Sequence, residues 1–489
     1  MPRLSRRSFL AGTAAIPFAL WFDKYAAAQT PTMTRCEVLT ADGQAMLQKY
    51  AQAVATMMST SEGDPRSWIF QWYTHGVNPA STKDAEIARI YAGNPGANGA
   101  LAGEMWNTCQ AHDPSQDENF FLPWHRMFVY FFERIIRSVL GDQQFALPYW
   151  NYSTPVTAAH GILPAQFRQQ GDATFGSLFR PNRNPGTNQG DAIDQDSPGA
   201  LDLDALMGET TYDQQSDAVQ GFCMDLDFNL HGSVHVMVGD SNGMGSIPSA
   251  ANDPIFWLHH CNVDRLWASW NRNGGKNLSG SWLTQQFIFA DENGNRVAAT
   301  VQDFLDLGRL GYTYDSFAPA PPGFAPPPIF GAAPPPPAVA TRVSNAVPLA
   351  AGPVQVPLEP TTPFGAAPTE AMPPNKRLYL VLKNLKAQAA PGVVYRIYLN
   401  LPPNASLADA RDHQVGTLNF FAALGHAGHG GSPSAGAKAR FFSTEITQVA
   451  RRLRERGQLS GKPIVTIAPA GQPAASAQPV VGQISLVAR

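Results

Sequence analysis

The sequence predicts a mainly α-helical bundle domain, a proline-rich linker and a small β-sandwich, in that order along the chain. Residues 29–315 are rich in aromatic side chains and contain runs with helical spacing of apolar positions. Residues 318–337 contain ten prolines, which cannot build a regular helix and favour extended backbone. Short runs rich in β-branched and aromatic residues follow after Pro374.

The first 28 residues are typical of an export signal. Arg6 and Arg7 precede a modest apolar run over 9–20, and the small residues at 26–28 offer a cleavage site. The run is too short to span a bilayer stably. We therefore expect export by the twin-arginine route, to the periplasm or outside the cell; a buried N-terminal helix is the alternative.

Charge and cysteine content exclude several classes of protein. The chain has 489 residues, a net charge of −3 and a pI of about 6.4. It therefore has no basic stripe for nucleic acid and no polybasic membrane patch. The absence of a CxxC motif excludes a zinc ribbon. The four cysteines allow three full pairings, and the sequence does not choose among them.

Three helices are expected in the 29–315 domain. Residues 42–59 and 125–141 have helical spacing of apolar residues, and the second run ends at Gly141, a residue common just past helix ends. Residues 254–270 begin with Pro254, which the first turn of a helix tolerates. The second and third of these runs carry histidines.

The C-terminal third is expected to contain a linker and a domain. We assign 316–374 to the linker, because alanine, proline and glycine stay frequent throughout it. We assign 375–489 to a β-sandwich, because it contains four strand-like runs separated by proline and glycine turns: 377–385, 393–401, 463–469 and 480–487.

The histidines of the helical domain fall into two groups. His231 and His235 are one helical turn apart and share a face, and His259 and His260 follow on the next helix. The earlier group is His75, His112 and His125, each beside aromatic or apolar residues. A single histidine in such a setting is usually a core residue, but six in this order indicate metal sites.

The choice of metal follows from the ligand types. Imidazole suits zinc, copper, iron and nickel. The lack of a carboxylate argues against the facial triad of non-haem iron, and the lack of the HExxH glutamate disfavours a zincin. Two neighbouring three-histidine sites favour a pair of copper ions that share O2.

Three segments carry a family resemblance: FLPWHRMFVYFFE, HGSVHVMVGD and NDPIFWLHHCNVDRLWASW. They resemble the two copper-binding signatures of the tyrosinase superfamily, which includes catechol oxidases and molluscan haemocyanins. The resemblance covers about residues 35–315. It implies a helical bundle with two copper ions, held by the ligand sets His75, His112, His125 and His231, His235, His260.

The resemblance makes the second residue of the His259–His260 pair the ligand. Helical geometry agrees, because adjacent side chains point about 100° apart. One departure from the family is the longer spacing between His112 and His125, where a polar insert is expected to loop out. Many relatives bond a cysteine to the second histidine through a thioether; Cys109 could do so with His112, or could be a buried free cysteine.

The resemblance also suggests roles near the second copper. In relatives an acidic residue just before the histidines of the second copper holds a water molecule that acts as a base. Asp227 is the candidate for this role here; the alternative is that Asp227 is the N-cap of the helix. Good hydroxylases often carry asparagine where this chain has Gly232. Counting back from His260 places Ile247 at the position where some catechol oxidases carry a phenylalanine that limits access to the second copper. Isoleucine is smaller than phenylalanine, which favours an open site.

Two more features resemble plant-type polyphenol oxidases. GYTYD (311–315) resembles the tyrosine motif that closes their catalytic domain, and the C-terminal domain resembles one that can cover the active site. Asp264 and Arg265 are expected to hold their helix through buried polar contacts, and Glu133 could either support the site or be exposed.

The expected function is oxidation of small phenols. The resemblance implies that O2 oxidises catechols to o-quinones, and that monophenols are hydroxylated in the ortho position. The alternatives are catechol or o-aminophenol oxidation without hydroxylation, and haemocyanin-like O2 binding. The expected partners are O2 and small phenols, without nucleic acid or a membrane anchor; the oligomeric state stays open.

Overall fold

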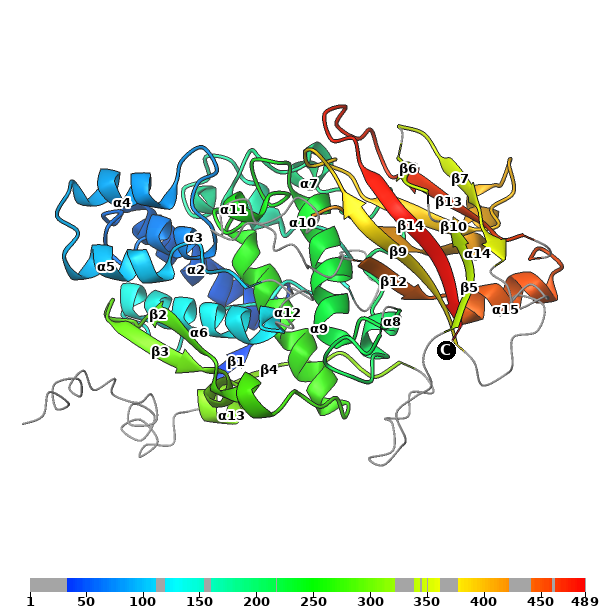
Figure 1. The fold of residues 1–489 in the computed structure, drawn as a ribbon. Coiled ribbons are helices and arrows are strands. Elements are labelled where there is room, and N and C mark those ends of the chain that lie inside the picture. The colour runs from blue at the N-terminus through cyan, green and yellow to red at the C-terminus, as the bar shows by residue number, and fades with distance from the viewer. Residues whose placement is uncertain are drawn as a thin grey trace, which may run out of the picture.

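The computed structural model has two parts, a helical domain and a β-sandwich, which lie against each other (Figure 1). It describes residues 33–110, 119–153, 160–216, 218–321, 338–343, 345–349, 351–360, 377–421, 441–459 and 462–488. The expected signal segment and most of the proline cluster lie outside these residues. Among the described helices, none is both long and apolar enough to cross a membrane.

The helical domain is built on the expected helices. The long ones are α2 (Ala41–Ser59), α6 (Phe121–Leu140) and α12 (Ile255–Arg272). Gly141 ends α6 in the left-handed conformation that favours glycine, with φ of 65°. Helix α6 packs between α2 and α12, and large aromatic side chains fill the core around them.

A third helical run carries the first histidine pair of the second group. It consists of α9 (Phe222–Asp225), the π-helical turn η3 (Leu226–His231) and α10 (Gly232–Val238). The domain also contains the helices α3 (Trp68–His75), α4 (Lys83–Tyr91), α5 (Gly96–Met105), α7 (Pro185–Gln189), α8 (Asp204–Met207), α11 (Ile247–Ala250) and α13 (Leu307–Leu310), and a hairpin of β2 (Gln286–Ala290) and β3 (Arg296–Thr300).

The two ends of the helical domain meet in one parallel strand pair, β1 (Met33–Arg35) and β4 (Tyr312–Tyr314). Arg35 is fully buried and binds Glu133 at 2.9 Å and Asp264 at 3.2 Å. Tyr312 and Tyr314 both donate to Asp264, and Arg126 pairs with the other oxygen of its carboxylate. The GYTYD segment therefore closes the domain, and Asp264 makes the expected buried contacts.

Replacing Asp264 by alanine should destabilise the helical domain by about 3–5 kcal/mol, because the buried Arg126 guanidinium loses its carboxylate partner. The free energy of unfolding in urea measures the loss. The control is Asp142→Ala, which removes a part-exposed pair with Lys49 and should cost less than about 1 kcal/mol. Equal losses in the two variants would contradict this role.

The C-terminal sandwich consists of two antiparallel sheets that face each other across an apolar core. One sheet has the order β11 (Gln414–Leu418), β10 (Tyr395–Leu399), β13 (Ile464–Pro469), β7 (Val354–Pro357). The other has the order β12 (Phe441–Glu445), β9 (Leu378–Lys386), β14 (Val480–Ala488), β5 (Ala338–Val343), β8 (Glu359–Pro360), and β6 (Val347–Pro348) pairs with β14. Helices α14 (Leu407–His413) and α15 (Thr447–Glu455) lie at one end.

The expected linker over 316–374 needs correction, since four strands of the sandwich begin within it. Strand β5 pairs with the central strand β14, and β7 pairs with β13. The sequence did not predict these strands because they are short and prolines flank them. An edge strand such as β7 tolerates proline at its end, where it need not donate a ladder hydrogen bond.

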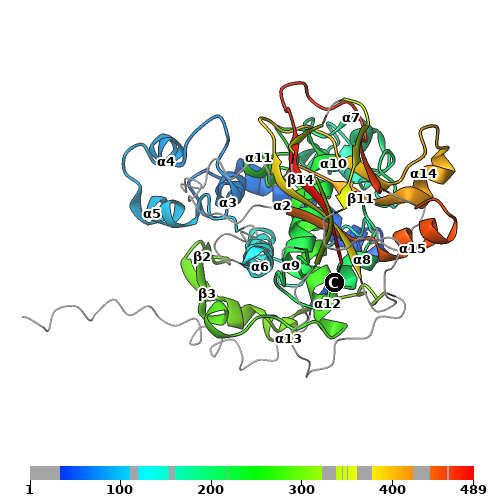
Figure 2. The same cartoon turned by 45° about the vertical axis from the view of Figure 1, so that its right-hand side comes forward.

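The sandwich docks on the helical run α9–η3–α10 (Figure 2). An apolar patch of Ala218, Val219, Met224 and Phe228 packs on side chains of β9, β12 and β14. Beside it, Gln220 donates to Phe441 O at 2.9 Å and accepts from Ser443 N at 3.2 Å. Asn229 links Gln220 to the buried carboxylate of Asp225.

Asp225 should make stability depend on pH. Burial raises the pKa of its carboxyl to about 7, although Asn229 donates to it, whereas the unfolded value is 3.8. Between these values the folded protein holds one more proton, so the free energy of unfolding should fall as pH rises, by at most roughly 1.4 kcal/mol per pH unit. Asp225→Asn should remove this slope in urea titrations; an unchanged slope would contradict the assignment.

Candidate metal centre

The first histidine cluster lies between α3 and α6. His75 ends α3, and His125 lies in the second turn of α6, both almost fully buried. The ring Nδ1 of His125 donates to Phe121 O at 2.8 Å, which directs Nε2 toward Cys109 Sγ at 3.6 Å. One potential ligand atom each of His75, Cys109 and His125 lies within 4.8 Å of the others.

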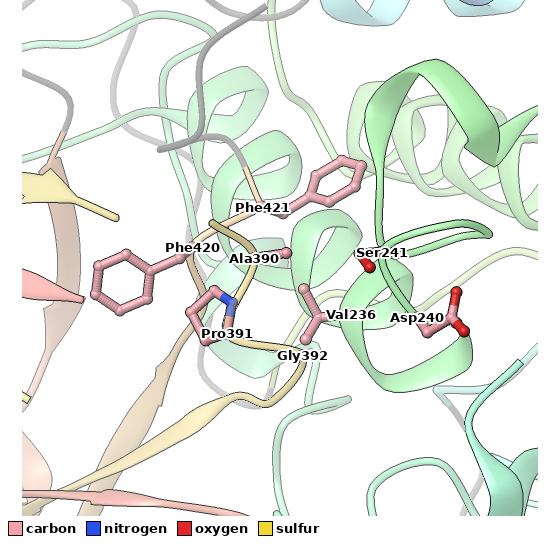
Figure 3. A pocket seen from close by; sticks show the side chains of 10 residues that line it. Val236, Asp240, Ser241, Ala390, Pro391, Gly392, Phe420 and Phe421 are labelled. Carbon is pink, nitrogen blue, oxygen red and sulfur yellow. The ribbon is translucent and has the colours of Figure 1, made fainter. Parts of the chain in front are cut away.

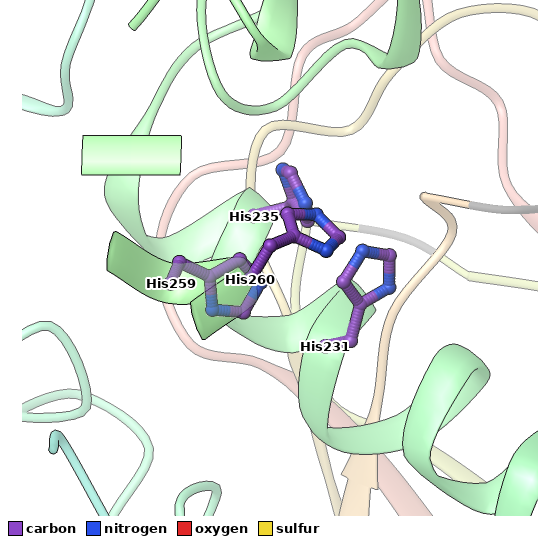
Figure 4. A group of neighbouring side chains, drawn as sticks. All are labelled: His231, His235, His259 and His260. Carbon is purple, nitrogen blue, oxygen red and sulfur yellow. The ribbon is translucent and has the colours of Figure 1, made fainter. Parts of the chain in front are cut away.

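The second cluster combines the π-helical run with α12 (Figure 4). Its members are His231, His235, His259 and His260, whose ligand atoms lie within 4.8 Å of one another. Nδ1 of His231 donates to Asp227 O at 3.0 Å, and Nδ1 of His235 donates to Met244 O at 2.8 Å. Their buried Nε2 atoms have no hydrogen-bond partner among the described residues, as expected of metal-ligating imidazoles.

The two clusters adjoin each other. The rings of His125 and His260 stack with centroids 4.3 Å apart, and the ring of His75 lies 6.4 Å from that of His260. Phe121 and Phe256 pack against these rings. Two metal ions held in these clusters would lie in one apolar region of the core, which is called the chamber below.

Burial keeps His125, His235 and His260 in the neutral form that binds metals. Burial, reinforced by the neighbouring His231, lowers the pKa of His125 to about 3. Burial and the other imidazoles also hold the pKa of His235 and His260 well below the usual value. At neutral pH each of these rings has one nitrogen with a free lone pair, so metal binding at that nitrogen need not displace a proton.

The position of His259 differs from the expectation that two adjacent histidines do not face the same site. Its ring lies 5.0 Å from that of His235 and 5.4 Å from that of His231, about as near as the ring of His260. The two backbone directions do differ, but an imidazole reaches far enough from its backbone to turn into the same chamber. The second cluster therefore contains four imidazoles.

The expected third histidine of the first site, His112, lies outside the described residues, as does its polar insert. A bond between Cys109 and His112 is therefore untested. Cys109 itself is buried beside His125, and all four cysteines are free. Burial, with the Asp227 carboxylate adding to it, raises the pKa of the Cys109 thiol well above its usual value, so Cys109 is a neutral thiol here.

The other predicted residues have distinct places. Asp227 is buried inside the helical run, with a carboxylate oxygen 3.1 Å from Nδ1 of His231, so it is not an N-cap. Gly232 lies against Asn419 of the sandwich. Ile247 is buried at the start of α11, within the core of the helical domain.

Phe421, a residue of the sandwich that the sequence does not single out, covers the second cluster. Its ring stacks on His235 with centroids 4.4 Å apart and lies edge-on to His231 at 5.8 Å. Phe421 and Phe420 line a pocket between the two domains with Val236, Asp240 and Ser241 on one side and Ala390–Gly392 on the other (Figure 3). Apart from its position after a strand, no sequence signal identifies Phe421.

Comparison with known protein families agrees with this geometry. Residues 65–273 match the common central domain of tyrosinase, and residues 280–321 match the polyphenol oxidase middle domain. Two stretches of the helical domain therefore match domains of the tyrosinase and polyphenol oxidase family. The sandwich, residues 339–489, matches a domain of unknown function.

Among relatives of this family, the chain is similar to tyrosinase HcTyr1 of Hahella sp., with 32% identity over 55% of this chain and 60% of that protein. It is 31% identical to polyphenol oxidase A1 of Vicia faba, over 55% of this chain and 45% of that protein. The matches thus span about half the length of these relatives. The structure of latent apple tyrosinase has the same fold, with 21% identity, a TM-score of 0.60 and coverage of 94% and 98% of the two chains.

The residues of this chain fit the dinuclear copper centre of the family. Imidazoles converge from α3, α6, the run η3–α10 and α12, and the buried Nε2 atoms of His231, His235 and His260 have no hydrogen-bond partner among the described residues. Imidazole is a good ligand for copper, and neither cluster includes a carboxylate among the residues that the structure describes. His75 and His125 would hold one ion, and His231, His235 and His260 the other.

Proposed function

We propose that this protein oxidises catechols to o-quinones with O2 and also hydroxylates monophenols in the ortho position. The observation that supports the proposal most strongly is the pair of adjoining imidazole clusters in one buried chamber. The copper ions, when bound, supply the electron transfer between the phenol and O2. Tyrosinase and polyphenol oxidase relatives support the same reaction class.

The chain's own residues orient the ligands and limit access to the chamber. Backbone carbonyls of Phe121, Asp227 and Met244 fix the tautomers of three ligating histidines. The carboxylate of Asp227 faces the ring of His231, where it can hold that imidazole in place. We also propose that Asp227 holds a water molecule that acts as a base and removes the proton of the phenol. Such a base is useful because the ordinary pKa of a phenol is near 10.

We further propose that the protein is latent while the sandwich is docked. Phe421 lies over His235 and His231, where a phenol would have to approach the second copper. Displacement of the sandwich would vacate this position and leave Val236 and Ser241 at the mouth of the chamber. Export by the twin-arginine route stays a prediction from the sequence.

O2 uptake by the copper-loaded protein tests the proposal. We expect uptake with catechol and with tyramine, and a higher rate after limited proteolysis within the proline cluster, residues 318–337. Uptake with catechol alone would restrict the protein to catechol or o-aminophenol oxidation. The absence of uptake before and after cleavage, with two copper ions bound per chain, would contradict the oxidase and favour O2 binding.

A further inference from the structure

Asn419 contacts the helical run of the second copper site from the other domain. It follows strand β11 and is 6% exposed. Its side-chain Nδ2 donates to Phe228 O at 2.7 Å and lies 3.3 Å from Asn229 O and 3.2 Å from Ser233 Oγ. All three acceptors lie within two or three residues of His231.

Two of the three acceptors of Asn419 belong to an unusual piece of helix. Phe228 and Asn229 are in the π-helical turn η3, which ends at His231. A π-turn is rare and less favourable than α-helix, and it persists where other contacts support it. It also changes the direction in which the following side chains project. The metal-ligating side chains that follow Asn229 are those of His231 and His235.

Gly232 makes room for Asn419. A Cβ atom at residue 232 would lie 2.7 Å from Asn419 Oδ1, closer than real Cβ atoms come, and 3.1 Å from its Nδ2, which is a tight contact. Gly232, which follows the ligand His231, therefore leaves the space that the side-chain amide of Asn419 occupies. The hydroxyl of the neighbouring Ser233 accepts a hydrogen bond from the same amide.

The other end of the same amide fixes the residue that covers the site. Asn419 Oδ1 accepts from Phe421 N at 3.1 Å. One side chain thus contacts both the turn that carries His231 and the backbone of Phe421, whose ring stacks on His235.

We propose that Asn419 is a positioning residue for the second copper site, and that it couples copper binding at this site to docking of the sandwich. The π-turn that Asn419 supports sets the direction of His231. If docking favours the copper-binding arrangement, copper binding favours docking by the same free energy, because such coupling is reciprocal. The sandwich is then part of the metal scaffold as well as a cover. The inference rests on the dinuclear copper site of the proposed function.

Copper affinity of the full-length chain, measured by competition with a chelator, tests the positioning role. Asn419→Ala should weaken the affinity of one of the two copper ions by about tenfold or more, as the loss of a support behind a ligand does, and leave the other unchanged. Asn419→Asp keeps the shape but removes the donor, so it should weaken the same ion. The matched control is Gln414→Ala, which removes a bond to Pro198 O across the same interface but away from η3.

Hydrogen exchange of the full-length chain tests the coupling. Copper should protect the amides of 414–421 and 441–445 in the wild type and in Gln414→Ala, but much less in Asn419→Ala. Gly232→Ala should also increase hydrogen exchange of the amides of 414–421. The double variant Gly232→Ala/Asn419→Ala should lose less protection than the sum of the losses in the two single variants, since both changes act on one contact.

Unchanged affinity of both ions in Asn419→Ala and Asn419→Asp, or an equal loss in Gln414→Ala, would overturn the inference. Protection by copper that is the same in wild type and Asn419→Ala would overturn the coupling. A wild-type chain that binds no copper would instead contradict the proposed function.

Discussion

Replacing His235 by alanine is expected to lower catechol oxidation at least about 100-fold and to reduce bound copper from two ions per chain to one. The magnitude is a lower bound, since loss of a group that only supports a ligand already costs about 10–100-fold. His235 is buried, its Nδ1 is fixed by Met244 O, and its Nε2 has no partner in the described part of the chain. Metal analysis and O2 uptake of the same preparation measure both effects.

The control for this variant is His160→Ala. His160 is part-buried in the same domain, where it pairs with Asp194 at 3.3 Å, away from both clusters. It should keep two copper ions and near wild-type activity. If His235→Ala kept both ions, or if His160→Ala lost one, the assignment of the second cluster would be wrong.

Replacing Phe421 by alanine is expected to raise the activity of the uncleaved protein about tenfold or more. Its ring covers His235 and His231, and burial of a phenylalanine side chain contributes about 1.5–3 kcal/mol to keeping this arrangement closed. Loss of that contribution shifts the population toward the open form by about 10- to 100-fold. The initial rate of catechol oxidation before proteolysis measures the change.

Phe420→Ala is the matched control, because its ring packs against Tyr395 in the core of the sandwich instead of on a histidine. It shortens the neighbouring side chain and leaves the Phe421 ring over the site. After proteolytic release of the sandwich, wild type and Phe421→Ala should have the same rate. A Phe421→Ala variant that is no faster than Phe420→Ala before cleavage would exclude Phe421 as the cover.

The helices that hold the metal ligands could be predicted because local pattern determines them. The apolar spacing over 125–141 and 254–270 and the HxxxH spacing each lie within one helix, and the four strand-like runs after residue 374 are all strands of the sandwich. Strands β5 to β8 escaped prediction because prolines surround them and their partners lie far along the sequence.

Contacts between the domains could not be predicted in the same way. Phe421 and Asn419 reach the histidines only because strand β11 ends beside η3, which is a property of the assembled fold. The π-turn also has no sequence signature. The sequence therefore could not predict that Gly232 lies against Asn419 of the sandwich. Neither the spacing in HH nor helical geometry alone revealed that the His259 ring turns into the chamber.

Anomalous diffraction at the copper absorption edge, from crystals of the copper-loaded protein, tests the central claim most directly. We expect two copper peaks in one chamber, one beside His75 and His125 and the other beside His231, His235 and His260. A single peak, or peaks away from the two histidine clusters in a protein that oxidises catechol, would contradict it.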